Sequence, residues 1–240
     1  MTRRGTTETC PNRYRTRATC QLPGNAVFGH VEAGTDRLIC AEHATSAIDQ
    51  TVRLPTVGDT FQKLGDLDAT ADEAPGLAAC VSARLIAEGI VSGELTDCVL
   101  VGLGRGPGLR HGDALESLDD ADGAWTTSST NGLHIDVERQ VYYGGQGGVS
   151  DAACPKCGSV ELFSDFSAAL DDWYKTGTAD HACPACARRS PINDWRLEPQ
   201  WGVGHLQLTF WNWPPLSKRF QKVVSSYLND HRLLFLFDKF

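Results

Sequence analysis

The sequence predicts an α+β fold in which ferredoxin-like β-α-β halves share one sheet and carry an inserted four-cysteine zinc ribbon. Segments with helical spacing of apolar residues alternate with short apolar segments typical of strands. Two CPxC motifs lie between two such groups, and a further set of cysteines lies near the N-terminus. We expect a zinc-knuckle-like module over residues 1–50. The α+β domain would span residues 51–240, with the ribbon inserted at about 151–195.

Composition narrows the class of protein. The 240 residues are 41% hydrophobic and 22% charged, which is ordinary globular composition and excludes collagen-like and wholly disordered chains. The 30 acidic residues outnumber the 22 lysines and arginines, and the net charge of −8 excludes a strongly basic protein. No apolar run approaches the ~20 residues that span a bilayer, and the polar start lacks a signal-peptide core. We therefore expect a cytoplasmic protein without a membrane partner.

The first half of the α+β domain is expected to begin with a boundary region. Residues 51–75 are acidic and poor in large apolar side chains, which indicates a linker or exposed loop that follows a short strand within 51–64. Pro75 suits the first turn of a helix over 76–88, and Gly89 suits its end. Residues 97–103 then predict a short buried strand.

Glycine-rich residues 102–108 follow that strand and invite comparison with a nucleotide-binding loop. Pro107 occupies a position where the dinucleotide pattern needs glycine, and no Gly-Lys-Ser/Thr follows. The next residues, 113–122, are acidic and would repel an anion. We therefore expect a flexible surface turn here.

The second half contains the remaining predicted elements. Residues 131–143 alternate in a way that predicts two strands in an antiparallel pair, and Phe166 to Lys175 has helical spacing. A β-α-β tail follows. It consists of a strand over 205–211, a break at 212–216, a helix with Ser217 as its N-cap, and a closing strand over 232–237.

The two CPxC motifs carry the strongest chemical signal. Each brings two thiolates onto one tight turn, and four thiolates in a tetrahedron suit Zn²⁺. Paired motifs without a strand–CxxC–helix context favour a structural zinc site over a redox site. The predicted ligands are Cys154, Cys157, Cys183 and Cys186, with 25 residues between the two motifs.

A second zinc site is predicted near the N-terminus, which gives two zinc ions per chain. Its ligands would be Cys10, Cys20, Cys40 and His43, in a C-x9-C-x19-C-x2-H pattern. The closing CxxH is typical of the second half of a knuckle. The alternative is three buried cysteines and a surface histidine. Cys80 and Cys98 fit neither pattern and are expected to be small buried hydrophobic residues.

Two resemblances accompany these patterns. Residues 20–43 resemble small actinobacterial zinc-knuckle proteins of the type C-x-x-P-G-x-A…C-x-x-H-A. Residues from about 75 to 240 resemble an actinobacterial zinc-ribbon family without an established activity. That resemblance rests on the segments VSGELTDC at 91–98, CPKCG, CPAC, WGVG at 201–204 and FWNWPPL at 210–216. It implies a zinc ribbon within an α+β domain.

These patterns favour a zinc-binding, non-enzymatic protein that is structural or binds a protein partner. A site with four cysteine ligands leaves no open position for water, whereas catalytic zinc sites usually keep one. Trp211 and Trp213 would form a docking surface, with the protein core as the alternative position for both rings. Arg13, Arg15 and Arg17 belong to a basic N-terminal arm that favours a nucleic-acid-binding alternative, although the acidic net charge opposes it. A zinc deaminase is disfavoured because neither CPxC motif is preceded by proline.

Overall fold

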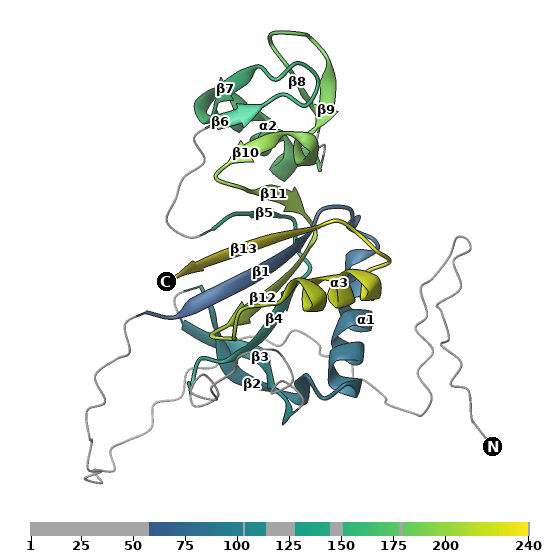
Figure 1. Ribbon diagram of the computed structural model, residues 1–240, viewed down its shortest axis with the longest axis vertical. Coiled ribbons are helices and arrows are strands. Elements are labelled where there is room, and N and C mark those ends of the chain that lie inside the picture. The colour runs from purple at the N-terminus through teal and green to yellow at the C-terminus, as the bar shows by residue number, and fades with distance from the viewer. Residues whose placement is uncertain (1–57, 103, 114–127, 145–150, 178–179, 240) are drawn as a thin grey trace, which may run out of the picture.

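The computed structural model describes residues 58–102, 104–113, 128–144, 151–177 and 180–239. Over these ranges the protein is a mixed α+β structure with antiparallel sheets and three α-helices (Figure 1). The helices are α1 (Ala74–Ala87), α2 (Phe163–Thr176) and α3 (Lys218–Tyr227). None of the helices in the described ranges is long and apolar enough to cross a membrane.

A six-stranded sheet forms the body of the molecule, in the order β13-β1-β12-β4-β3-β2. Every pair of neighbouring strands is antiparallel. The strands are β1 (Thr60–Asp66), β2 (Val91–Val101), β3 (Gly104–His111), β4 (Gly132–Asp136), β12 (Leu206–Trp211) and β13 (Leu233–Lys239).

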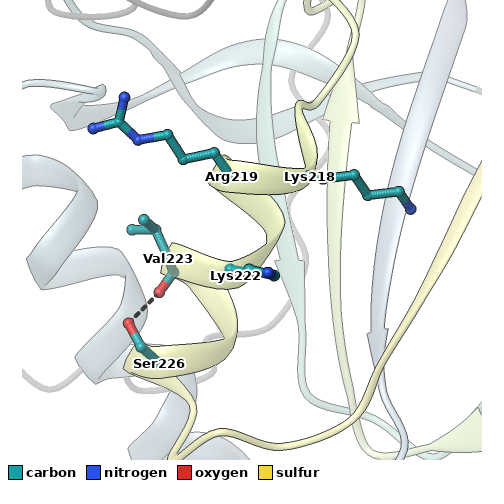
Figure 2. Close-up of a pocket in the computed structure, with 5 residues that line it drawn as sticks. All are labelled: Lys218, Arg219, Lys222, Val223 and Ser226. Atoms are coloured by element: carbon teal, nitrogen blue, oxygen red, sulfur yellow. Dashed lines mark hydrogen bonds between the residues drawn. The ribbon is translucent and has the colours of Figure 1, made fainter.

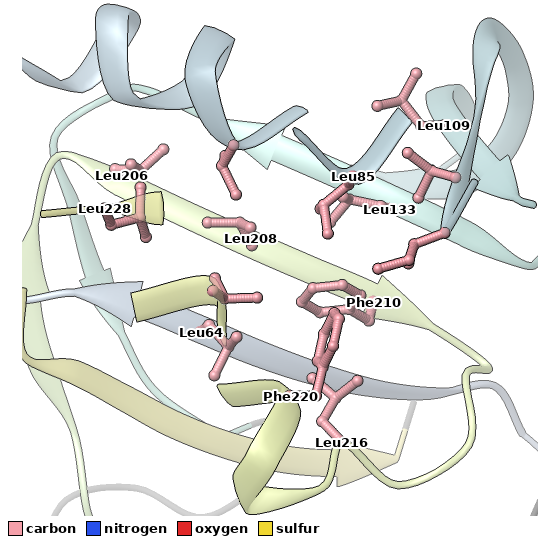
Figure 3. Packing of buried hydrophobic residues seen from close by; sticks show 14 of the residues in the cluster. Leu64, Leu85, Leu109, Leu133, Leu206, Leu208, Phe210, Leu216, Phe220 and Leu228 are labelled. Atoms are coloured by element: carbon pink, nitrogen blue, oxygen red, sulfur yellow. The ribbon is translucent and has the colours of Figure 1, made fainter. Parts of the chain in front are cut away.

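Helices α1 and α3 cover one face of this sheet and form the main core with it (Figures 1 and 3). Leu64, Leu208 and Phe210 project from the central strands toward Leu85 of α1 and Phe220 of α3, and all five are buried. Burying a side chain of this size is worth ~1.5–3 kcal/mol. The packing of these apolar stripes therefore fixes the two helices on the same side.

Local signals set the helix ends where the sequence predicts them. Pro75 lies in the first turn of α1, and Gly89, just after the helix, has a φ of 70° that suits glycine. The side chain of Ser217 accepts a hydrogen bond from the N–H of Phe220 and caps α3. The predicted helices over 76–88 and 166–175, and the helix that begins after Ser217, are confirmed.

The short strand expected within 51–64 exists as β1, but it extends to Asp66 and is followed by a loop, so the expectation of a linker or exposed loop holds only for residues 67–73 of the described part. Strand β1 is an interior strand of the sheet, between the edge strand β13 and β12. Its last residue, Asp66, is fully buried. The Asp66 carboxylate accepts hydrogen bonds from the N–H groups of Asp68 and Ala69, and it contacts His231 at 2.9 Å. An acidic residue can be buried at the end of this strand because its carboxylate oxygens have hydrogen-bond partners.

The expectation of a flexible turn over 102–108 is wrong, since β3 begins at Gly104 and pairs with β2. The glycines serve close packing. A Cβ added at Gly106 would lie 2.7 Å from the side chain of Val101, and one at Gly108 would lie 2.4 Å from that of Val99. β2 itself begins at Val91 and is longer than the predicted strand over 97–103.

The two strands predicted within 131–143 exist, but they do not pair with each other. β4 pairs with β12 and β3, whereas β5 (Gln140–Tyr142) pairs with β11 (Gly202–Gly204). The buried hydroxyl of Tyr142 donates to the carbonyl of Leu206 at 2.8 Å and accepts from its N–H at 3.0 Å. These bonds hold β5 against the start of β12.

The cysteine-containing segment forms a separate small unit, here called the cysteine module, at residues 151–198 (Figure 1). It has its own buried cluster, which includes Phe166, Trp173 and Trp195. Helix α2 packs on a three-stranded sheet in the order β10-β6-β7, and β8 pairs with β9. The strands are β6 (Asp151–Ala153), β7 (Val160–Leu162), β8 (Asp180–Ala182), β9 (Arg189–Pro191) and β10 (Arg196–Glu198).

Polar contacts join the cysteine module to the six-stranded sheet. The carboxamide of Asn193 donates to the carbonyl of Leu67 at 3.0 Å. Arg232 bridges Asp68, at 2.7 Å, and Asp194, at 3.2 Å. Because these ion pairs are partly exposed, they contribute little to the free energy of unfolding. Their main effect is to orient the cysteine module relative to the sheet.

Candidate metal centre and neighbouring surfaces

The two CPxC motifs form matching turns. The N–H of Gly158 donates to the carbonyl of Cys154 at 2.9 Å, and the N–H of Ala187 donates to that of Cys183 at 2.8 Å. Gly158 and Ala187 both have positive φ, at 74° and 57°. The N–H of Lys156 also donates to the sulfur of Cys154 at 3.4 Å. Each turn therefore points two sulfur atoms toward one place.

The four sulfur atoms meet in the arrangement that a tetrahedral metal needs. All four Sγ atoms lie within 4.8 Å of one another. The Cys154–Cys186 separation is 4.0 Å, and the Cys157–Cys183 separation is 3.7 Å. A zinc ion bound at 2.3 Å would place its sulfur ligands about 3.8 Å apart. These separations far exceed the ~2.05 Å of a disulfide bond, and the four cysteines are free.

The electrostatics of the cluster also favour a cation. Burial raises the pKa of Cys154, but N–H groups of Lys156 and Cys157 and neighbouring thiols lower it to about 7 overall. The N–H of Ser159 lowers the pKa of Cys157, but burial and the other thiols raise it to about 12. One thiolate therefore forms readily, and further ionisation is opposed. A divalent cation removes that opposition, because metal binding displaces thiol protons.

The donor set is closed. Four thiolates complete a tetrahedron and leave no position for water, as in structural zinc sites. Cys154 and Cys183 are buried within the core of the cysteine module, Cys186 is half-buried and Cys157 is exposed. The cluster can therefore hold a metal at the edge of the module and tie both turns to the core.

The other predicted ligands, Cys10, Cys20, Cys40 and His43, lie outside the described residues, as do Arg13, Arg15 and Arg17. The second zinc site and the basic arm remain predictions. Of the two remaining cysteines, Cys98 is fully buried beside Phe61 and Trp211, as expected. Cys80 is only half-buried, because it lies at the margin of the core face of α1.

Trp211 and Trp213 are core residues in the structure, which favours that alternative over an exposed docking surface. Trp211 is 7% exposed and packs at a centroid distance of 5.3 Å on Phe61. Trp213 is 4% exposed and packs at 4.8 Å on Phe210. The two prolines after Trp213 turn the chain beneath α3, where Gln62 donates to the carbonyls of Trp213 and Pro214.

A basic groove on α3, here called the α3 groove, was missed in the sequence. Its volume is about 440 Å³, and its walls are Lys218, Arg219, Lys222, Val223 and Ser226 (Figure 2). Figure 2 shows Lys218 and Arg219 pointing in opposite directions from the first turn. The helix contains no acidic residue, although the whole chain is acidic. That local contrast in charge was the available signal.

Comparisons with protein-family models, with curated proteins and with solved structures give no match. The resemblance to actinobacterial zinc-ribbon and zinc-knuckle proteins therefore stays a prediction. What the protein can do has to be inferred from the geometry of the cysteine cluster and of the surfaces around it.

Proposed function

We propose that this is a non-enzymatic zinc protein whose metal holds the cysteine module in shape while a separate surface binds a protein partner. The convergence of four sulfur atoms with tetrahedral separations carries the proposal. Zn²⁺ is the metal that best matches four thiolates in this geometry. Because the site is closed, the zinc has no position from which to activate water.

The α3 groove is the described surface best suited to a partner. Three cations and Val223 line the groove, so it offers both charge and an apolar surface. An acidic segment of a partner protein complements it, with carboxylates toward Lys218, Arg219 and Lys222 and an apolar side chain over Val223. Charge complementarity of this kind speeds association and selects partners.

Four finer assignments belong to the same proposal. The fold is ferredoxin-like, supported by the order β13-β1-β12-β2 with the β3 and β4 strands added between β12 and β2. A second zinc ion binds the N-terminal knuckle. The chain belongs with the actinobacterial zinc-ribbon proteins that its motifs resemble, and it acts in the cytoplasm.

Elemental analysis of the native, tag-free protein tests the metal. We expect two zinc ions per chain, and one in a variant in which Cys10, Cys20 and Cys40 are replaced by serine. Replacing Cys154 and Cys183 should remove the other. Less than one zinc per wild-type chain would contradict the proposal, whereas a value near one would remove only the N-terminal site.

Fluorescence anisotropy with a labelled peptide of glutamates flanking two leucines tests the α3 groove. Replacing Lys218, Arg219 and Lys222 by glutamate should weaken binding roughly tenfold or more. The matched control makes the same change in charge at Lys156, Lys175 and Arg196, which are exposed on the cysteine module, and should bind better than the groove variant. Equal loss in both variants would show unspecific attraction and reject the groove.

The nucleic-acid alternative is tested with the same variants. Duplex DNA replaces the peptide, and binding is measured over a range of salt concentrations. Nucleic-acid binding gives a steep linear dependence on the logarithm of salt concentration because counterions are released. Tighter binding to DNA than to the peptide would favour that alternative, with the α3 groove and the arginine arm as its candidate contacts.

A further inference from the structure

A cavity lies where the cysteine module meets the six-stranded sheet. Its volume is about 260 Å³, and its walls come from the loop that follows β1, the end of α2, and β11 with the residues around it. Ligand sites often occur where two structural units meet. An apolar cavity of about 150 Å³ can hold benzene. This one therefore has room for a single substituted ring.

His205 is the unusual residue in its wall. It is only 9% exposed, and its ring packs at a centroid distance of 5.0 Å from Trp173. Within the described part of the chain, the ring nitrogens of His205 make no hydrogen bond. These nitrogens are not among the fully buried polar atoms without a partner, so they are accessible and can bond to a molecule that enters the cavity.

The other polar side chains of the wall are already satisfied. The carboxamide of Asn193 donates to the carbonyls of Leu67 and Val203 and accepts from the N–H of Val203. The hydroxyl of Thr70 donates to Glu73 and accepts from its N–H. The remaining wall is apolar or glycine, and no lining residue carries a charge. His205 therefore supplies the hydrogen-bonding group that a ligand would use.

We propose that this cavity binds a small uncharged ring compound whose hydroxyl or N–H group hydrogen-bonds to His205. Burial and the nearby Arg139 guanidinium both lower the pKa of His205. A neutral imidazole has a ring nitrogen that can accept a hydrogen bond from such a ligand. The same guanidinium lies over Trp173 at 5.5 Å from the ring centroid, and its Nη1 donates to the carbonyl of Tyr174. This inference does not depend on the zinc site.

Three probes of similar shape test the chemical class: phenol, toluene and benzoate. Binding to the full-length zinc protein is followed by NMR through the Trp173 indole N–H and the imidazole resonances of His205. We expect saturable shifts with phenol and about fivefold weaker binding of toluene, which corresponds to one hydrogen bond of ~1 kcal/mol. Benzoate should bind more weakly than phenol, because no charged side chain lines the cavity.

Two variants place the binding in this cavity. Ala71 is exposed at its rim, and Ala71→Trp should block entry and weaken phenol binding at least tenfold. The matched control, Ala79→Trp, adds the same side chain on an exposed position of α1 and should bind like the wild type. His205→Phe keeps an aromatic ring but should make phenol and toluene bind equally.

Several results would overturn the proposal. They are the absence of saturable shifts with phenol in the wild type, phenol binding that survives Ala71→Trp, and equal affinities of phenol and toluene in the wild type. Tighter binding of benzoate than of phenol would also overturn it, because the site would then select anions. Should His205→Phe not fold, the comparison of Ala71→Trp with Ala79→Trp still decides the matter.

Discussion

At the residue scale, the two metal-binding turns use different residues for the same backbone conformation. Gly158 and Ala187 occupy equivalent places after the second cysteine, and both lie in the left-handed region. Glycine adopts this conformation freely, whereas a residue with a Cβ is strained there by ~1–2 kcal/mol. The second turn thus holds a strained residue next to a predicted metal ligand.

We therefore predict opposite effects of two small substitutions. Ala187→Gly should raise the free energy of unfolding of the zinc-loaded protein by about 0.5–1 kcal/mol, because relief of strain exceeds the entropy that glycine costs. Gly158→Ala should lower it by about 1 kcal/mol. No atom lies within 4 Å of the added Cβ, so the loss would come from conformation alone. Urea unfolding measures both, and changes of the same sign would contradict the prediction.

A pH dependence follows from His205. Burial, and then the Arg139 guanidinium, lower its pKa in the folded state below the ordinary value of 6.5. The unfolded chain therefore binds a proton first as the pH falls through about 6.5, and the folded state loses stability. His205→Gln removes this pH-dependent contribution to the free energy of unfolding. The stability of the wild type relative to this variant should decrease from pH 7.5 to pH 5.5 in urea unfolding. A constant difference would show that His205 titrates normally.

At the element scale, α3 depends on its cap. Ser217→Ala removes the hydrogen bond from the Phe220 N–H and should lower the free energy of unfolding by about 1 kcal/mol. Ser226→Ala is the matched control in the same helix, because its exposed hydroxyl donates only to the carbonyl of Val223. Urea unfolding of both variants checks this. Equal losses would mean that helix propensity, and not the cap, accounts for the change.

Elements with a local signal could be predicted from the sequence. The helices have apolar stripes and end residues such as Pro75 and Ser217, and β12 and β13 have apolar segments of strand length. β1 was predicted only as a short strand within 51–64, and β3 was not predicted, because Asp66 and the glycines of 104–108 are signals of loops. In the fold, Asp66 is fully bonded and the glycines make room for valines. These residues can lie in strands because of contacts with residues that are distant in the sequence, and such contacts cannot be recognised from the local sequence.

The difference between local and long-range signals also applies to the two sites, the cysteine cluster and the cavity at His205. The cysteine cluster could be predicted because each half lies within four consecutive residues, and a spacing of this kind has one dominant meaning. The cavity at His205 could not be predicted. Its walls come from segments that are distant in the sequence and are brought together by long-range contacts such as the β5–β11 pairing and the Asn193 hydrogen bonds.

At the scale of the whole molecule, the cysteine module and the sheet have separate cores, so we expect them to lose structure separately. Structural zinc contributes ~10–16 kcal/mol in small zinc peptides, a value comparable to the ~5–15 kcal/mol stability of a whole domain. Cys157→Ser should therefore unfold the module while the sheet stays folded. Near-ultraviolet circular dichroism should then lose only part of its tryptophan signal, because Trp211 and Trp213 lie in the cores of the sheet, and far-ultraviolet circular dichroism would follow the remaining structure.

The control is Cys80→Ser, which changes a half-buried side chain on α1 and leaves the cluster intact. It should change the melting temperature only slightly. Equal melting temperatures for the two cysteine variants would contradict the zinc assignment. A single cooperative loss of all signals in Cys157→Ser would show that the module and the sheet are one folding unit.

The pairing of β5 with β11 also bears on how such a protein can change over evolution. Tyr142 lies opposite Gly202, so the chain leaves the sheet and returns to it at neighbouring positions. Everything between them is, in effect, the loop of one hairpin. Lengthening a loop is cheap, since each doubling costs only about 0.6 kcal/mol of closure entropy. The module could thus be acquired, exchanged or shortened to a tight turn while the six strands keep their places.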